Sequence, residues 1–266
     1  MEQVDSNLYS KAYYQNAYGR SILSEDGTYF KTGHLTIFSE MANLLKLQPT
    51  DRIVDYGCGN GDLAFFLVSR YGCDCTGIDY SKSAIDICQE KLQMIPQYTG
   101  KMRFINTNND YQHDFSNIKA VYLADVVEHM YDPEIELVLS QIRGWGSDVS
   151  IVVHTDNTFY LNTIRPVFDF IHIIFGIRTW KAVREANQHD RSLHVNLTNP
   201  YRLRRLMRKN GFEEVLFKYP TLNKETLVRN QLGKLQNIPL IVSFSLVALK
   251  ILDFLSPTFY ALYKKA

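Results

Sequence analysis

Short apolar runs alternate with amphipathic stretches between residues 52 and 154. The runs with strand character are Arg52–Tyr56, Asp74–Asp79, Met102–Asn106, Ala120–Ala124 and Val149–His154. The stretches with helical spacing between them are Asp62–Arg70, Lys82–Met94 and Pro133–Arg143. Strands that alternate with helices predict a parallel, doubly wound α/β sheet, in which ligands bind beyond the carboxyl ends of the strands.

The segments on either side of this alternation have a different pattern. Residues up to about 49 are rich in tyrosine and end in a helical pattern over His34–Leu47. After His154, apolar side chains in the insertion Thr158–Trp180 recur at helical spacing, which predicts an amphipathic helix. Its expected apolar face carries Val167, Phe168, Ile171, Ile174 and Phe175, and its expected polar face carries Arg165, Asp169 and His172.

The C-terminal part predicts one more helix, over Asn199–Asn210, and two strands, at Glu214–Tyr219 and Thr258–Tyr263. Between these strands, Ile238–Leu255 is apolar nearly all round, but it is interrupted by charged residues. A membrane-spanning helix needs about 20 apolar residues, so this run is too short for one.

Length and composition fit one elaborated domain. The 266 residues are 45% hydrophobic, which is enough for one sizeable core with appended segments. We expect this domain at residues 50–266, with apolar helical insertions at about 158–190 and 224–256, behind an N-terminal cap or lid at residues 1–49. The 29 basic and 28 acidic residues give a net charge of +1, which does not favour binding to DNA or RNA.

Cysteine usage and the N-terminus bear on location. The four cysteines match neither a zinc-binding pattern nor a secreted disulfide framework. The start, Met1–Asp5, is polar and acidic, unlike a signal peptide. We therefore expect a cytoplasmic protein with reduced thiols, and the apolar insertions raise the hypothesis of peripheral contact with the inner face of a membrane.

The strongest functional signal follows the first strand, where Gly57, Gly59 and Gly61 alternate before a helix. Alternating glycines let the backbone turn sharply and approach a ligand, and the amides at a helix N-terminus suit an anionic group. The spacing differs from the dinucleotide fingerprint, whose third glycine falls one residue later. Asp79 ends the next strand about 20 residues on, where a carboxylate can hold ribose hydroxyls. The pattern is typical of a nucleotide-type cofactor loop.

Four ordered segments resemble those of the class I S-adenosylmethionine-dependent methyltransferases. Asp55–Gly61 resembles motif I of that family, and Gly77–Ser81 resembles motif II. Leu123–Pro133 and His194–Pro200 are similar to the segments that follow strand four and precede strand six in the small-molecule branch. The resemblance implies a seven-stranded Rossmann-like sheet with its last strand antiparallel, and S-adenosyl-L-methionine as the cofactor.

The resemblance also implies roles in cofactor binding. The expected residues are Asp55, Gly57, Cys58, Gly59, Gly61, Asp79, Tyr80, Asn108, Asp110 and Ala124. Asp55 would reach the cofactor's ammonium through water, Asp79 would hold the ribose, and Tyr80 would lie against the adenine ring. The family places an acidic residue near the adenine amino group. Here we favour Asn108 in that place, with Asp110 as the alternative.

Methyl transfer to a hydroxyl requires an aligned nucleophile and removal of its proton. His129, His154 and His194 are candidates because each lies at or beyond the predicted cofactor-facing edge and histidine titrates near neutral pH. Glu128 precedes His129 and could orient it or act with it. The alternative for each histidine, and for His154 above all, is a satisfied core or cap position.

A divalent metal is an alternative that we do not expect. Asp125, Glu128, His129 and His194 offer the oxygen and nitrogen ligands that hold Mg²⁺, Mn²⁺ or Zn²⁺. The run Val126–Met130 is similar to the metal-binding segment of small-RNA 2′-O-methyltransferases and of ubiquinone-pathway O-methyltransferases. Without a metal, the Glu-His pair would shape the methionine pocket.

We expect transfer of a methyl group to an oxygen of a small or lipid- or glycan-linked metabolite, in specialised-metabolite or cell-envelope biosynthesis. The alternatives are a metal-dependent RNA 2′-O-methyltransferase and a non-catalytic cofactor-binding assembly subunit. Nitrogen and carbon acceptors stay open. The insertion after the fifth strand occupies the place where the family builds its substrate lid, so its apolar face could cover an apolar acceptor, contact a bilayer or form a homodimer.

Overall fold

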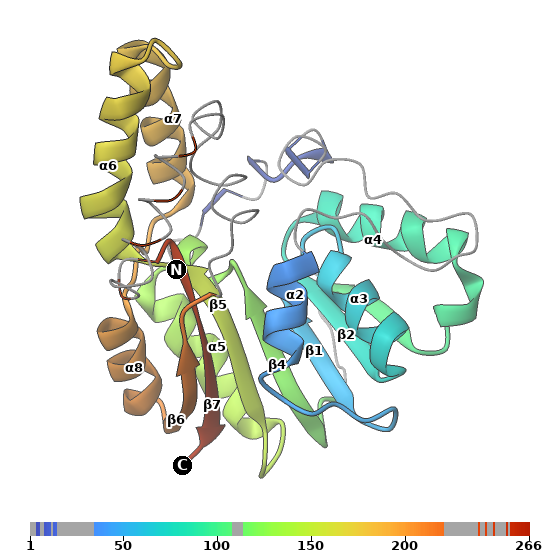
Figure 1. Ribbon diagram of the computed structural model, residues 1–266. Coiled ribbons are helices and arrows are strands. Elements are labelled where there is room, and N and C mark those ends of the chain that lie inside the picture. The colour runs from blue at the N-terminus through green and yellow to red at the C-terminus, as the bar shows by residue number, and fades with distance from the viewer. Residues whose placement is uncertain are drawn as a thin grey trace.

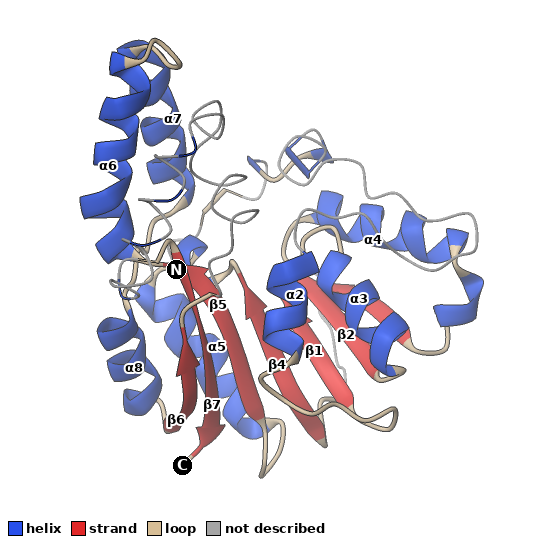
Figure 2. Cartoon of the chain, in the orientation of Figure 1, coloured by secondary structure: helices blue, strands red, loops and turns tan. Residues whose placement is uncertain are grey.

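The computed structural model describes residues 4–5, 8–11, 13–14, 35–107, 114–220, 239, 243, 247, 254 and 256–266. Within these residues the chain forms a seven-stranded sheet with the order β3-β2-β1-β4-β5-β7-β6 (Figure 2). The strands are β1 (Arg52–Tyr56), β2 (Asp74–Asp79), β3 (Met102–Asn106), β4 (Ile118–Ala124), β5 (Ser150–Asp156), β6 (Phe212–Lys218) and β7 (Thr258–Lys265).

The first five strands are parallel, and β7 lies antiparallel between β5 and β6. The order in which successive strands are placed reverses between β1 and β4. The strands β2 and β3 lie on one side of β1, and the later strands lie on the other. Ligands of doubly wound sheets bind at this point, beyond the carboxyl ends of the strands. The expected sheet is confirmed, including its antiparallel last strand.

Helices cover both faces of the sheet (Figure 1). On one face, α2 (Leu35–Ala42) and α3 (Asp62–Tyr71) form a buried cluster with the strands, and α4 (Lys82–Met94) adds Leu92 at its edge. On the other face, α5 (Asp132–Gly144) and α8 (Pro200–Lys209) pack against the sheet. Alternate residues of β4 serve the two layers, as the period of a strand requires: Val121 belongs to the second cluster and Tyr122 to the first.

Two further helices, α6 (Thr158–Ile174) and α7 (Trp180–Leu193), rise side by side beyond the carboxyl edge of the sheet (Figure 1). The helical spacing of α6 is confirmed, and the polar face of the helix is the one that is turned inward. Asp169 and His172 are buried, whereas Val167, Ile174 and Phe175 are 55%, 63% and 58% exposed.

Polar groups from the residues that follow α6 explain why its polar face is turned inward. The buried Asp169 carboxylate lies 3.5 Å from an Arg178 Nη1 atom. The amides of Ile177 and Arg178 both donate to the carbonyl of His172, which closes the turn before α7. The sequence pattern of α6 alone contains no information about the helix that packs against it, so it cannot decide which face turns inward.

Other differences concern element ends. The helix expected over His34–Leu47 runs only from Leu35 to Ala42, and β6 begins at Phe212, two residues earlier than expected. Gly211, with φ +80°, makes the turn from α8 into β6. Most of the expected insertion at 224–256, including most of Ile238–Leu255, lies outside the described residues. Among the helices that the structure describes, none is long and apolar enough to cross a membrane.

Candidate active site

The loop after β1 folds tightly against the end of β2. The amides of Gly57 and Cys58 both donate to the carbonyl of Ile78, at 2.7 and 2.9 Å. Gly57 has φ +71°, and a Cβ atom there would lie 2.6 Å from Cγ2 of Val126. Only glycine tolerates both the left-handed backbone and this close approach. The first glycine therefore brings the loop against the segment that follows β4.

The third glycine permits close packing. Gly61 precedes the first residue of α3 with φ +81°, and a Cβ atom there would lie 2.9 Å from Sγ of Cys88 and 3.2 Å from the ring of Phe104. Its neighbours Asn60 and Asp62 line the cavity described next, and Gly61 does not. The expected approach of its backbone to the cofactor stays a prediction.

A cavity of about 290 Å³ opens beyond the carboxyl ends of β1, β2 and β4. The expected residues on its lining are Asp55, Gly57, Cys58, Gly59, Asp79, Tyr80, Ala124, Asp125 and His129. Lining residues that sequence reasoning missed include Phe38, Asn60, Asp62, Leu63, Thr107, Met130, Glu134 and Leu137. Asn108 and Asp110, expected near an adenine ring, lie outside the described residues. Their neighbour Thr107 is on the lining.

Asp55 is a buried carboxyl group whose Oδ2 atom finds no hydrogen-bond donor among the described residues. Burial raises its pKa to about 7 from 3.8, and the nearby charge of Asp79 adds to the rise, although a hydrogen bond from the Ala64 backbone opposes it. A buried acceptor without a donor is costly. Its position on the cavity wall therefore fits a ligand with a positive, hydrogen-bonding group.

Asp79 holds the loop and also faces the cavity. Its Oδ2 accepts from the Gly59 amide at 2.9 Å, and its Oδ1 accepts from the Ser81 amide at 2.8 Å. Burial raises its pKa to about 6, and these amides oppose the rise. Each carboxylate oxygen has further lone pairs, so the group can still accept from a pair of hydroxyls. This position matches the expected ribose contact.

The N-terminal segment lies over the same cavity. Tyr9, Tyr13 and Tyr14 are on its lining. The Tyr9 carbonyl accepts from the Ser81 hydroxyl at 3.0 Å, and the Tyr9 ring lies edge-on to that of Tyr80, with centroids 5.8 Å apart. These described tyrosines therefore pack over the cofactor loop, as the cap expected at residues 1–49 would.

Two histidines meet at the edge of the cavity. The ring centroids of His129 and His194 lie 4.7 Å apart, almost perpendicular. Nδ1 of His129 lies 3.0 Å from the Leu193 carbonyl and 3.1 Å from the Tyr9 hydroxyl. Because a carbonyl can only accept, Nδ1 carries the proton and Nε2 keeps a lone pair. Burial, and then the neighbouring His194, lower the pKa of His129 below its usual 6.5, so the neutral ring prevails at neutral pH.

His194 has a carboxylate partner. Its Nδ1 atom lies 3.2 Å from Oδ2 of Asp156, at the end of β5, and both side chains are about a quarter exposed. A carboxylate at Nδ1 fixes the tautomer and the orientation of an imidazole. This histidine–carboxylate pair was not expected, because 38 residues separate its members along the chain.

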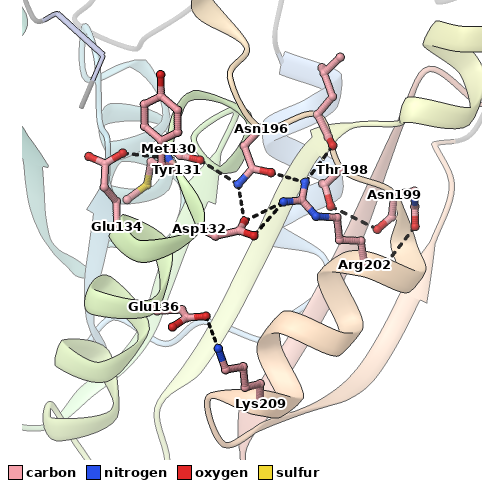
Figure 3. Close-up of polar contacts among 11 residues, drawn as sticks. Met130, Tyr131, Asp132, Glu134, Glu136, Asn196, Thr198, Asn199, Arg202 and Lys209 are labelled. Atoms are coloured by element: carbon pink, nitrogen blue, oxygen red, sulfur yellow. Dashed lines mark hydrogen bonds and ion pairs between the residues drawn. The ribbon is translucent and has the colours of Figure 1, made fainter. Parts of the chain in front are cut away.

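The segment that carries His194 is fastened to the start of α5, as Figure 3 shows. The Asn196 amide group donates to the Met130 carbonyl at 2.8 Å and to an Asp132 carboxylate oxygen at 2.9 Å. Arg202 of α8 binds both carboxylate oxygens of Asp132, at 2.8 and 2.9 Å, and also contacts the Asn196 carbonyl oxygen. These bonds hold the His194 segment beside the His129 segment.

Glu128 and His154 lie outside the linings of the described cavities. Glu128 is fully buried in the short 3₁₀ turn η3 (Val127–His129), and its Oε2 accepts from the Thr155 hydroxyl at 2.7 Å. Burial, with Asp125 and Asp156 nearby, raises its pKa well above the usual value. Direct catalysis by Glu128 is therefore not supported, and the group has a structural position.

His154 is buried at the end of β5, and its Nδ1 atom lies 2.7 Å from Oδ1 of Asp125, although not at a hydrogen-bonding angle. Its ring packs on Tyr260 with centroids 4.7 Å apart. Asp125 has the left-handed φ of 54°, which is uncommon outside glycine and marks a constrained turn at the cavity wall. His154 thus lies in a core position behind Asp125, away from the cavity, but neither ring nitrogen has a hydrogen-bond partner among the described residues, unlike the satisfied position that the alternative expected.

The proposed metal ligands do not form a ligand set. Asp125 lies against His154, Glu128 against Thr155, and His194 against Asp156. Within the described part of the chain, no group of three or more His, Cys, Asp or Glu side chains is arranged to hold a metal ion. The metal hypothesis for these four residues is therefore not supported.

Comparison with known proteins gives matches to parts of the chain. A family model described as a methyltransferase domain matches residues 53–145. Phosphoethanolamine N-methyltransferase 3 of Arabidopsis thaliana is 30% identical over 77 residues, which are 29% of this chain and 14% of that protein. An H3 lysine-79 specific histone-lysine N-methyltransferase of Dictyostelium discoideum is 24% identical over 118 residues, or 40% of this chain and 6% of that protein. The chain thus spans only a small part of these relatives.

Solved structures resemble the chain over most of its length. Mycolic acid cyclopropane synthase, solved with S-adenosylhomocysteine, has a TM-score of 0.59 at 13% identity, and the match covers 97% of this chain and 95% of that one. Magnesium protoporphyrin IX methyltransferase from Synechocystis PCC 6803, also solved with S-adenosylhomocysteine, has a TM-score of 0.51 at 14% identity and covers 87% and 81%. At these identities the likeness establishes the fold alone.

Proposed function

We propose that this chain is a class I S-adenosylmethionine-dependent methyltransferase that methylates an oxygen atom of a small or lipid- or glycan-linked acceptor. The observation that carries the proposal is the neutral His129 on the cofactor cavity, in contact with His194. A hydroxyl acceptor must lose a proton as it is methylated, and a positioned imidazole near its own pKa is the usual base for this task.

The lining residues fit the cofactor. Asp55 offers a buried oxygen that has no donor among the described residues, which suits the cofactor's ammonium, directly or through water. Asp79 suits the ribose hydroxyls, and Tyr80 supplies a flat wall for the adenine ring. When bound, S-adenosylmethionine supplies a methyl group on a positively charged sulfur. Cys58 also lines the cavity, but burial raises its pKa well above the usual value, so its thiol stays protonated and is not a nucleophile.

The residues around the histidines fit proton removal. The Leu193 carbonyl fixes the proton of His129 on Nδ1, which leaves the lone pair of Nε2 to accept a proton from the acceptor. His129 would take the proton that the acceptor hydroxyl loses when it is methylated. Asp156 orients His194, which is the second candidate base for a hydroxyl bound on its side.

A nitrogen acceptor is the second candidate, because a relative over 77 residues acts as a phosphoethanolamine N-methyltransferase. An RNA acceptor has less support, since its argument depended on a metal-binding segment whose residues do not converge. An assembly role without catalysis, a homodimer and contact with a membrane surface stay predictions.

A labelling experiment tests the function. Purified protein is incubated with methyl-deuterated S-adenosylmethionine and with separate lipid and aqueous extracts of the source cells, and labelled products are identified by mass spectrometry. We expect a labelled methoxy group that His129→Ala fails to produce, while binding of S-adenosylhomocysteine by the variant is unchanged. A labelled N-methyl product would overturn the oxygen assignment, and a product formed equally by His129→Ala would overturn the assigned base.

A further inference from the structure

A second cavity of about 380 Å³ lies between α6 and α7. It is separate from the cofactor cavity, with which it shares no described lining residue. Its volume falls within the range of about 300–1,000 Å³ that is typical of small-molecule sites. The helices that form it follow β5 directly, so its base is at the carboxyl edge of the sheet and its far end is at the turn between α6 and α7.

The charged side chains of this groove lie in its lower half. Its base is lined by His194 together with Leu161, Asn162 and Leu197, and Arg165, Asp169 and Arg191 lie next along the two helices. Toward the turn, they carry Ile173 and Trp180, together with Phe170 and Val183. Arg165 and Ile173 are eight residues apart on one helix, so at 1.5 Å per residue the two zones are about 12 Å apart.

The charged zone is basic. Of the described lining residues, Asp169 alone carries a carboxylate, and that group already lies 3.5 Å from Arg178. Two arginines at one end of a narrow groove attract an anionic group, which guanidinium ions bind with two donors each. The opposite end offers aromatic and branched walls, and Trp180 is still 66% exposed there. An apolar ligand would therefore cover side chains that water now contacts.

The base of the groove adjoins the reaction centre. His194 lines the groove, and its ring lies 4.7 Å from that of His129, which lines the cofactor cavity. A molecule held at the base of the groove is thus close to the candidate bases. The two histidines therefore lie where the two cavities approach each other.

We propose that this groove is the acceptor site and that the acceptor is an anionic amphiphile. Its phosphate or carboxylate group lies at Arg165 and Arg191, its apolar chain runs toward Trp180, and the atom to be methylated lies beside His194. This inference rests on the proposed methyltransferase function, because only a methyltransferase has a methyl acceptor. Binding to the groove can nevertheless be tested without any turnover.

The two tryptophans of the chain make a direct test available. Trp145 stacks on Phe115, with centroids 4.4 Å apart, on the other side of the sheet, so Trp145→Phe leaves Trp180 as the single tryptophan in a conservative background. In this background, decyl phosphate is added below its critical micelle concentration and Trp180 emission is recorded. The neutral decyl maltoside and sodium phosphate are titrated in parallel.

We expect decyl phosphate to shift the emission to shorter wavelength in a saturable way, at least about tenfold more tightly than decyl maltoside, and sodium phosphate to cause no shift. Arg165→Gln and Arg191→Gln should each weaken decyl phosphate about five- to tenfold at low salt, and added salt should reduce the difference. Arg184→Gln is the matched control, because Arg184 is an exposed arginine of α7 that is not on the groove lining.

Binding of S-adenosylhomocysteine, measured by calorimetry on every variant, separates the two proposals. If decyl phosphate causes no saturable shift while S-adenosylhomocysteine still binds, the groove is not the site and the methyltransferase proposal stands. Equal affinities for the neutral and anionic chains, or an equal loss in Arg184→Gln, would also overturn the inference. Failure of the unmodified chain to bind S-adenosylhomocysteine would instead overturn the proposed function.

Discussion

Replacing Asp55 with asparagine should stabilise the ligand-free protein while it weakens cofactor binding. The carboxyl group is 2% exposed, and its Oδ2 atom has no donor among the described residues. Asparagine has nearly the same size but carries no charge at any pH. The substitution therefore removes a buried charge that only the cofactor's ammonium would compensate.

The magnitude follows from the pKa of Asp55, which burial raises from 3.8 to about 7. Because the native carboxyl binds its proton more tightly than the unfolded one, the free energy of unfolding falls as the pH rises through this window. At 1.36 kcal/mol per pH unit, the ionised group costs about 4 kcal/mol above pH 7. The new amide donor has no acceptor and costs about 1–3 kcal/mol. The net gain at pH 8 is then about 1–3 kcal/mol.

Thermal unfolding without cofactor, at pH 5 and pH 8, tests this reasoning. For a protein of this size we expect Asp55→Asn to raise Tm by about 3–9 °C at pH 8 and not at pH 5, where the wild-type carboxyl is protonated. The affinity for S-adenosylhomocysteine should fall at least about tenfold. Asp74→Asn is the control, since that side chain is 50% exposed at the other end of β2. An equal loss of Tm at both pH values would refute the reasoning.

Three further predictions concern the loop and the histidines. His129→Ala should lower kcat about 10²–10⁴-fold. Wild-type kcat should rise with pH to a plateau through an apparent pKa below 6.5, because the neutral ring is the active form. A rise in kcat only above pH 7 would contradict this role. Gly57→Ala places Cβ 2.6 Å from Val126 at φ +71° and should lower the free energy of unfolding, measured by chemical denaturation, by about 2–4 kcal/mol. Val126→Ala should restore part of this loss, and an unchanged denaturation midpoint in Gly57→Ala would disprove the packing argument. Asn196→Ala removes the hydrogen bonds that position His194. It should lower kcat about tenfold or more and leave the affinity for S-adenosylhomocysteine unchanged. Full activity of this variant would show that these hydrogen bonds are dispensable.

Local pattern was sufficient for the cofactor half of the fold. The bounds of β1, β2, β3 and α4 match the sequence prediction, because each end has a local signal: Gly57 follows β1, β2 and β3 end at Asp79 and Asn106, and Pro96 follows α4. The positions of Asp55 and Asp79 were predictable for the same reason, since the carboxyl ends of central parallel strands lie at the ligand-binding edge of the sheet. These positions depend on neighbours in sequence, which a sequence pattern records.

Contacts between distant segments were not predictable in this way. The pairing of His194 with Asp156, and its packing against His129, depend on how α6 and α7 return the chain to the sheet. The inward face of α6 depends in the same way on α7. Glu128 was assigned to the site because carboxylates are common in sites, but its neighbours in space place it in the packed interior.

Calorimetric titration of the purified chain with S-adenosylhomocysteine decides whether the cavity beyond β1 and β2 seats an adenosyl cofactor. We expect one site per chain, and we expect Asp79→Ala to weaken binding about 100-fold, because it removes two charge-assisted hydrogen bonds worth about 1.5 kcal/mol or more each. Asp74→Ala should leave the affinity unchanged. If the wild-type chain gives no binding heat at millimolar ligand, or if Asp79→Ala binds as tightly as wild type, the cofactor site lies elsewhere or does not exist.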